Sequence, residues 1–227
     1  MATINQLISE IAHSLKQPNS VPVRQAIKLG IIHARNEAIR RTYTNHNYTD
    51  KVLEQKFRVQ LINIPDGDIY GTEDLNLPII KRSKNKIPRP VRLTNNLPFH
   101  SVRSIGVTNT INIPFIREHV MKNYAALPGM CPTIGYDYIN EYLYVSSPVE
   151  GTINTINAVV IESVFEYPHI IETETIEGKL DINSISDDDE FLLPEDMIGT
   201  IKKFILETWN PEVIRETNEV NGINKVQ

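Results

Sequence analysis

Cysteine is almost absent from this sequence, which holds one, Cys131, in 227 residues. A single cysteine excludes an internal disulfide framework and a zinc site built from several cysteines. Long hydrophobic runs are also missing, and none approaches the roughly 20 residues that a transmembrane helix needs. The opening segment MATINQLISE has no basic stretch followed by an apolar one, so no signal peptide is visible. We therefore expect a reducing compartment, or assembly inside a cell, and no membrane partner.

Motifs for catalysis and cofactor binding are missing as well. The chain has no GxGxxG or GxxxxGK pattern for nucleotide phosphates and no GxSxG pattern for a nucleophilic serine. No two of its six histidines lie three or four positions apart, so a His-x-x-x-His site is absent and we expect no zinc enzyme. Asp66-Gly67-Asp68 opens like a calcium loop but lacks a correctly spaced Glu, so we expect a turn there. We predict no catalytic residue, no metal site and no cofactor; the alternative is an enzyme that uses Glu118, His119 or Cys131 in a cleft.

Charge is unevenly distributed along the chain. Residues 1–117 hold 17 Lys and Arg against 8 Asp and Glu, a net charge of +9, whereas residues 118–227 hold 6 against 20, a net charge of −14. Two kinds of partner would explain this split: nucleic acid facing the basic half, or the acidic half of a second copy. Two solvated surfaces of opposite charge are the third possibility.

Two helices are predicted at the start, within a helical region that spans residues 1–47. Thr3 and Gln6 have the spacing of a capping box at the start of a helix over residues 3–16. Pro22 near a first turn predicts a second helix that runs to about Tyr43. The pattern of this second helix predicts a basic face formed by Arg24, Lys28, Arg35, Arg40 and Arg41.

A β-rich domain is predicted over residues 48–171. Apolar and polar residues alternate over 57–61, which is the period of a half-buried strand. Residues 136–139 and 142–145 flank Asn140-Glu141 in the pattern of a tight hairpin, although Glu replaces the usual Gly. The β-branched run 158–165 and the segments 99–107 and 111–116 predict further strands, with a helical turn over 117–127. The fold class is therefore α+β, with an antiparallel β domain after the helical pair.

A basic segment, residues 81–92, follows a loop over residues 65–78. This segment also contains two prolines, Pro88 and Pro90. Because proline cannot donate to a β-ladder, we expect an extended basic arm or an edge, and not a central strand. We predict that this arm binds a partner through Lys81, Arg82, Lys84, Lys86, Arg89 and Arg92.

The last part of the chain is acidic and contains one more helix. Residues 172–193 are predicted to be an acidic, solvated linker, and its tetrad Asp187, Asp188, Asp189 and Glu190 is a candidate acidic partner site. Pro194 near a first turn predicts a C-terminal helix over 194–210. Residues 211–227 are predicted to be a flexible tail that orders when a partner binds.

Three stretches, taken in order, resemble a known family: 135–145, 159–168, and 193–198 running on to residue 207. The shared pattern is a hairpin with an Asn-Glu turn, a strand that ends in Phe-Glu-Tyr-Pro, and Pro-Glu-Asp-Met-Ile at the start of a helix. Residues 88–93 and 98–99 add to the likeness. Together they are similar to structural proteins of short-tailed phages, in particular the head–tail connector or neck ring proteins of crAss-like phages.

This resemblance implies a function and a location. Such proteins form closed homo-oligomeric rings below the portal of the virion, with a dodecamer as the expected count, and they are assembled in the host cytoplasm. The implied partners are other copies of the chain, the portal protein and neighbouring tail or ring proteins, while double-stranded DNA passes through without specific binding. In such a ring, the basic side of one copy can face the acidic side of the next. The alternative is a nucleic-acid-binding accessory protein that uses the basic N-terminal half.

Overall fold

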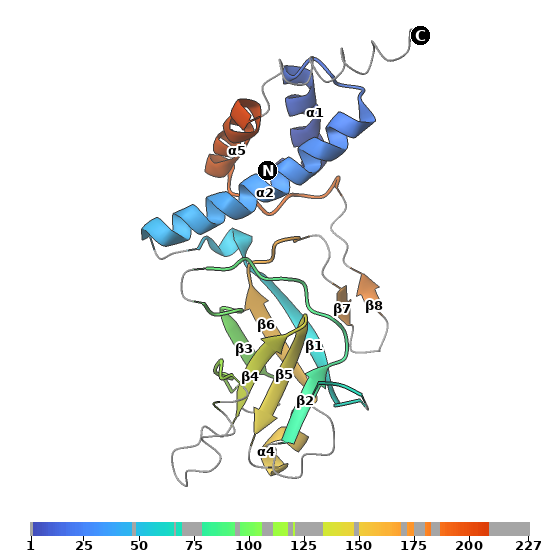
Figure 1. Ribbon diagram of the computed structural model, residues 1–227, viewed down its shortest axis with the longest axis vertical. Helices are drawn as coiled ribbons and strands as arrows, with labels where there is room; N and C mark the ends of the chain where they lie inside the picture. The colour runs from blue at the N-terminus through green and yellow to red at the C-terminus, as the bar shows by residue number, and fades with distance from the viewer. Residues whose placement is uncertain are drawn as a thin grey trace, which may run out of the picture. The chain divides into compact units, whose positions relative to one another are not determined.

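The computed structural model of the chain describes residues 2–46, 49–65, 67–69, 79–93, 96–105, 111–117, 120, 134–147, 150–168, 172–174, 180–182 and 187–208 (Figure 1). The chain divides into two compact units. Residues 1–53 and 185–227 form the helical unit, and residues 54–184 form the sheet unit. The chain therefore leaves the helical unit once and returns to it. The α+β class predicted from the sequence is confirmed.

Three helices make up most of the helical unit. α1 spans Ile4–Ser14 and begins with the predicted capping box: Gln6 N donates to Thr3 Oγ1 over 3.1 Å, and Thr3 N donates to Gln6 Oε1 over 3.0 Å. These two bonds satisfy amide groups that the first turn of a helix otherwise leaves unpaired. α2 spans Val21–His46 and α5 spans Glu195–Thr208, so helices are present in both regions where the sequence predicts them.

The core of the helical unit joins all three helices to the segment that precedes α5. Spacings of three and four residues place the apolar side chains of α1 on one face, where they can be buried together. Phe191 and Leu193, at the end of the predicted linker, are 2% and 1% exposed and belong to the same core. The buried members are Ile4, Leu7, Ile8, Ile11, Ala12, Leu15, Ile27, Ile31, Ala34, Phe191, Leu193, Ile201 and Ile205.

Six antiparallel strands form the main sheet of the second unit, in the order β3-β6-β1-β2-β5-β4 (Figure 1). Their bounds are β1 Gln55–Asn63, β2 Ile79–Ser83, β3 Ser101–Ser104, β4 Gly135–Ile139, β5 Tyr142–Ser147 and β6 Ala158–Ser163. A 3-10 turn over Lys51–Leu53 precedes β1, and the short helix α4, Glu150–Asn154, connects β5 to β6. Buried and exposed residues alternate along the middle of β1, as predicted, because neighbouring residues of a strand face opposite sides of the sheet.

The segment 111–116 closes the sheet between its two outer strands, β3 and β4. On one side, Ile113 N donates to Val102 O over 2.8 Å, and on the other side Tyr136 N donates to Pro114 O over 2.9 Å. The sequence predicts a strand here. The segment instead pairs through isolated bridges, since Pro114 has no N–H to donate to a ladder. The two outer strands are therefore partly covered and are not left as long free edges.

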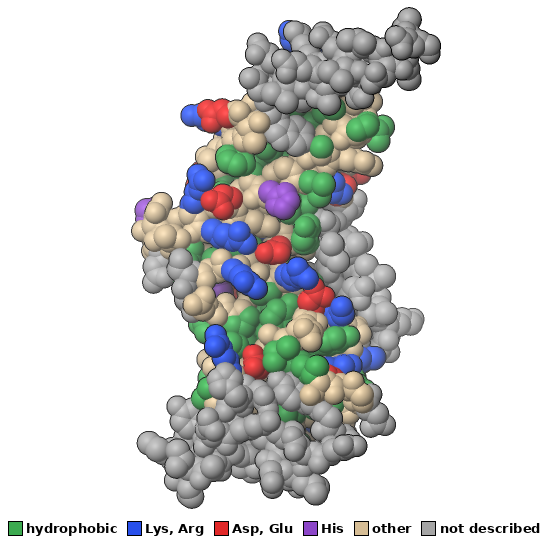
Figure 2. Space-filling model, viewed as in Figure 1, with side chains coloured by type: hydrophobic (Ala, Val, Ile, Leu, Met, Phe, Trp, Pro, Cys, Tyr) green, Lys and Arg blue, Asp and Glu red, His purple; other side chains and the backbone are tan. Residues whose placement is uncertain are grey.

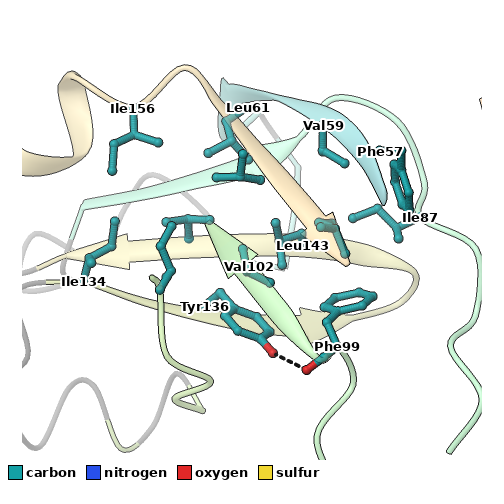
Figure 3. Close-up of a cluster of buried hydrophobic side chains, with 14 of the residues drawn as sticks. Phe57, Val59, Leu61, Ile87, Phe99, Val102, Ile134, Tyr136, Leu143 and Ile156 are labelled. Carbon is teal, nitrogen blue, oxygen red and sulfur yellow. Dashed lines mark hydrogen bonds between the residues drawn. The ribbon is translucent and has the colours of Figure 1, made fainter. Parts of the chain in front are cut away.

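The core of the sheet unit fills the inner face of this curled sheet (Figure 3). Phe99 and Phe165 are 1% and 0% exposed, with ring centroids 6.4 Å apart. Tyr136 is 3% exposed, and its hydroxyl donates to Phe99 O over 3.5 Å. Large aromatic side chains bury much apolar area each, so this cluster is a major source of the unit's stability. The other buried members are Phe57, Val59, Leu61, Ile87, Val102, Ile113, Ile134, Leu143, Val145, Ile153, Ile156, Val159 and Ile161.

Two expectations about chain segments differ from the structure. β2 lies between β1 and β5, so residues 81–83 belong to a central strand and not to a basic arm. Pro88 and Pro90 follow the strand, so they limit ladder pairing only beyond it. Part of the predicted linker is also structured, since β7, Glu172–Glu174, pairs antiparallel with β8, Leu180–Ile182. Most of the predicted helical turn 117–127 and the whole tail 211–227 lie outside the described residues.

Candidate functional site

Lys81, the first of the six basic residues predicted to bind a partner, lies in the core. Its register opposite Val145 places it on the inner face of β2, and it is only 6% exposed. Lys81 Nζ donates to Ile156 O over 3.0 Å, to Asn157 Oδ1 over 3.1 Å and to Asn154 O over 3.4 Å. The ammonium group thus binds oxygens at the end of α4 and just beyond it. Burial lowers the pKa of Lys81.

Arg82 lies on the opposite face of β2 and is held by an acidic and an aromatic partner. Its Nη1 atom donates to Asp68 Oδ2 over 2.6 Å, and its guanidinium carbon lies 4.3 Å from the centre of the Tyr142 ring. Asp68 also accepts a hydrogen bond from Tyr144 Oη over 2.9 Å. Burial and the hydrogen bond to Asp68 raise the pKa of Tyr144 to about 12. Asp68 and the Tyr142 ring therefore interact with the charged group of Arg82 within its own subunit.

Lys86 and Arg89 share one carboxylate at the turn between β4 and β5. Glu141 accepts hydrogen bonds from Arg89 Nε over 2.8 Å and from Lys86 Nζ over 3.2 Å. Asn140 and Glu141 have φ values of 52° and 69°, the left-handed conformation of a type I′ turn, in which glycine is the usual second residue. The bond from Arg89, followed by that from Lys86, lowers the pKa of Glu141. The predicted hairpin is confirmed, and its unexpected Glu anchors the segment 84–89.

Lys84 and Arg92 complete the predicted basic site. Lys84 N donates to Gln60 O over 2.9 Å, and Lys84 Nζ donates to Gln60 Oε1 over 3.4 Å. Arg92 is exposed and makes no ion pair with the residues that the structure describes. Five of the six residues therefore make polar side-chain contacts within their own subunit.

The acidic tetrad also contacts its own subunit. Asp187 Oδ2 lies 2.5 Å from Lys28 Nζ of α2, and both side chains are 33% exposed. Asp188 Oδ1 accepts a hydrogen bond from Asn5 Nδ2 over 2.6 Å, and Asn5 N donates to Asp187 O over 3.1 Å. Asp189 and Glu190 are exposed. These contacts tie the segment before α5 to α1 and α2.

Folding brings the basic and acidic halves of the sequence together in both units. The helical unit holds 11 Lys and Arg against 13 Asp and Glu, a net charge of −2, and the sheet unit holds 12 against 15, a net charge of −3. On the face drawn in Figure 2, blue and red side chains accordingly lie interspersed. A nearly balanced unit produces little long-range steering, so the charge split of the sequence does not by itself define two opposite binding faces.

Arg35 is a buried cation that the helical pattern wrongly predicts on an exposed basic face. It is 0% exposed and lies between Ile31 and Ile39 at steps of four residues, which places it on the buried face of α2. Its Nε atom donates to Leu192 O over 3.2 Å, and its guanidinium carbon lies 5.9 Å from the centre of the Phe191 ring. Burial lowers the pKa of Arg35 to about 10. The sequence feature that indicates this burial is the position of the arginine in the middle of an apolar stripe.

A groove of about 690 Å³ opens in the sheet unit where β1 and the basic segment separate. One wall is the edge of β1 over residues 57–60, and the other is the segment 84–89. Phe57 and Ile87 form part of its floor, and Figure 3 shows them close together at one end of the core. Arg58 also lines the groove, is exposed, and has no ion pair within the described residues. The basic segment therefore helps to form this groove.

The residues weighed for metal binding and catalysis give no site in the described part of the chain. No three His, Cys, Asp or Glu residues come together there as a metal ion would require. Glu118, His119 and Cys131 lie outside the described residues. Gly67 has a φ of +83°, which suits a tight turn, and Asp68 is bonded to Arg82. Of the helices that are described, none is long and apolar enough to cross a membrane.

The family of the chain is shown by a match over almost its whole length. No curated protein matches the sequence. The family model CrAss_Ring_2, described as phage tail ring protein 2, matches residues 6–221 and so includes residues of both structural units. The resemblance to a ring protein of a crAss-like phage is thereby confirmed at the level of the family. The chain belongs to the phage tail ring protein 2 family and is a structural component of a phage virion.

Proposed function

We propose that the chain is a non-enzymatic subunit of a closed homo-oligomeric ring in the portal–tail connector, or neck, of the virion. The match to a tail ring protein family over residues 6–221 is the observation that carries this proposal. A ring of identical copies needs an interface with two different sides, because each copy contacts one neighbour on each side. The likeness seen in the sequence suggests a dodecamer through which double-stranded DNA passes without specific binding.

The proposed partners are other copies of the chain, the portal protein and neighbouring tail or ring proteins. Assembly takes place in the host cytoplasm. The contacts of the basic segment support DNA passage without specific binding, because five of its six predicted cations make polar contacts within the subunit, which would compete with binding to phosphates. The same contacts count against a nucleic-acid-binding accessory function.

Ring formation is tested with the purified full-length chain, alone and mixed with the portal protein of the same virion. Native mass spectrometry gives the number of copies, and electron microscopy shows whether the oligomers are closed. We expect rings of one stoichiometry, either from the chain alone or on addition of the portal. A chain that stays monomeric at high concentration and does not bind the portal would overturn the proposal.

DNA binding is measured in parallel with a fluorescent duplex at about 50 mM and about 200 mM salt, a range over which phosphate-driven binding falls by orders of magnitude. We expect no saturable binding at either concentration. Tight binding that weakens steeply with salt would favour the accessory function instead. Arg92→Gln is the matched variant, because it removes an exposed cation that has no ion pair with described residues.

A further inference from the structure

Part of one strand edge is open in the sheet unit. β1 pairs with β6 over residues 55–60 but with β2 only over residues 61–63. Lys84 N donates to Gln60 O. Beyond Lys84 the chain leaves β1, and Ile87 N donates to Glu141 O instead. Among the described residues, no backbone hydrogen bond is made on the β2 side of residues 56–59, although β7 lies near β1. Such an edge is a template for an added strand.

The groove beside this edge carries surplus positive charge. Among the described residues that line it, four cations and two carboxylates give a net charge of +2. These residues are Arg58, Lys84, Lys86, Arg89, Glu141 and Glu166. The floor is apolar, with contributions from Phe57, Val59 and Ile87. An open backbone edge, an apolar floor and surplus positive charge together fit an extended acidic segment.

The C-terminal segment of the chain has this chemistry. Residues 209–221 follow α5 directly and hold three glutamates, at 212, 216 and 219, against Arg215, a net charge of −2. Val213, Ile214 and Val220 are β-branched residues that suit a strand. Fully extended, this segment spans roughly 45 Å. The family match extends through residue 221, so the segment belongs to the part that the ring protein family shares.

From these observations we propose that the groove beside β1 binds residues 209–221 of a neighbouring copy in extended form. This contact rests on the proposed ring and names one of its interfaces. The groove belongs to the sheet unit and the segment to the helical unit, so the two sides of the interface differ, as a head-to-tail ring requires. Each copy gives its segment to one neighbour and receives a segment from the other.

Mixed cross-linking tests whether the segment reaches a different copy. Two full-length proteins are prepared on a Cys131→Ser background, one with Gln60→Cys in the groove and one with Glu216→Cys in the segment. Because each protein has a single cysteine, a disulfide that joins one of each, identified by a mass tag, forms only between copies. We expect this pair in large excess over a control pair in which Lys203→Cys on α5 replaces the groove cysteine. A disulfide that forms only when both cysteines are in one chain would overturn the proposal.

Charge reversal tests the chemistry of the contact. Arg58→Glu places a carboxylate against the acidic segment, and we expect about tenfold weaker self-association. Adding Glu216→Arg to the same chain should restore association, a rescue that a purely structural role of Arg58 would not give. Arg92→Glu is the matched control, because Arg92 is exposed in the same unit but does not line the groove. No loss with Arg58→Glu, or an equal loss with Arg92→Glu, would overturn the assignment.

A peptide separates failure of this contact from failure of the ring. A fluorescein-labelled peptide of residues 209–221 is titrated with the dilute full-length chain, and binding is followed by anisotropy. Saturable binding that Arg58→Glu weakens supports the groove even when no ring forms, in which case the ring proposal fails alone. Rings that form without any binding of the peptide overturn the groove contact and leave the ring. Absence of both overturns both.

Discussion

Replacing Lys81 by methionine distinguishes two incompatible roles for this residue. The sequence predicts Lys81 in an exposed arm that binds a partner, whereas the structure buries it within hydrogen-bonding distance of three oxygens. A hydrogen bond from a charged donor contributes about 1.5–3 kcal/mol, and a buried carbonyl that loses its donor costs about 1–3 kcal/mol. Removing the buried charge recovers part of its desolvation. We therefore expect Lys81→Met to lower the free energy of unfolding by about 2–4 kcal/mol.

Urea unfolding, followed by circular dichroism and by tyrosine fluorescence, measures this change. Because the chain has two units, the loss should be confined to the transition of the sheet unit. Lys84→Met is the control, since the contact of its ammonium group with Gln60 is long and lies at the surface, and we expect a change below about 0.5 kcal/mol. A Lys81→Met protein of unchanged stability that no longer assembles would refute the structural role and restore the partner role.

Three other changes test the two units. Arg35→Met should alter the free energy of unfolding by less than about 1.5 kcal/mol, since an apolar side chain of similar length avoids burying a charge. Arg35→Ala should lower it by about 3–4 kcal/mol. Equal losses of the two variants in urea unfolding would contradict this. Tyr144 has a pKa of about 12 in the folded chain and 10 in the unfolded one, so it keeps its proton longer when folded and stability falls between these pH values. Tyr144→Phe should therefore lose less stability from about pH 9 to about pH 11, measured by circular dichroism, and a slope equal to that of the wild type would argue against it. Asp187→Asn should cost about 0.5–1 kcal/mol in urea, and a cost that persists at about 1 M salt would show that its ion pair with Lys28 is not the cause.

Elements set by neighbouring residues could be predicted from the sequence. The capping box of α1 needs two hydrogen bonds between Thr3 and Gln6, three residues apart, so the spacing is sufficient information. The hairpin around Asn140 depends on two turn residues and the strands beside them. The alternation of β1 follows from one face that is buried and one that is solvated.

Local sequence patterns misplace residues whose partners are distant in the chain, for a physical reason. The oxygens that bind Lys81 belong to residues 154–157, more than 70 positions away, and no local pattern shows that a lysine will meet them. Arg35 lies in an apolar stripe, which indicates burial, but the carbonyl that receives it belongs to Leu192. Local periodicity gives the face of a helix or strand, whereas the groups that compensate a buried charge depend on the tertiary fold.

The charge split along the sequence has a structural consequence for assembly. Asp187 forms an ion pair with Lys28, and each unit has a small net charge. Net charge therefore contributes little to the selection of a neighbouring subunit. Selectivity must then come from short-range contacts, and the groove at Arg58 offers open backbone groups beside a cation without an ion pair among described residues. A contact of this kind limits itself, because each groove takes one segment. In the proposed ring, closure would cover every such edge, so the proposed contact would also prevent edge-to-edge aggregation.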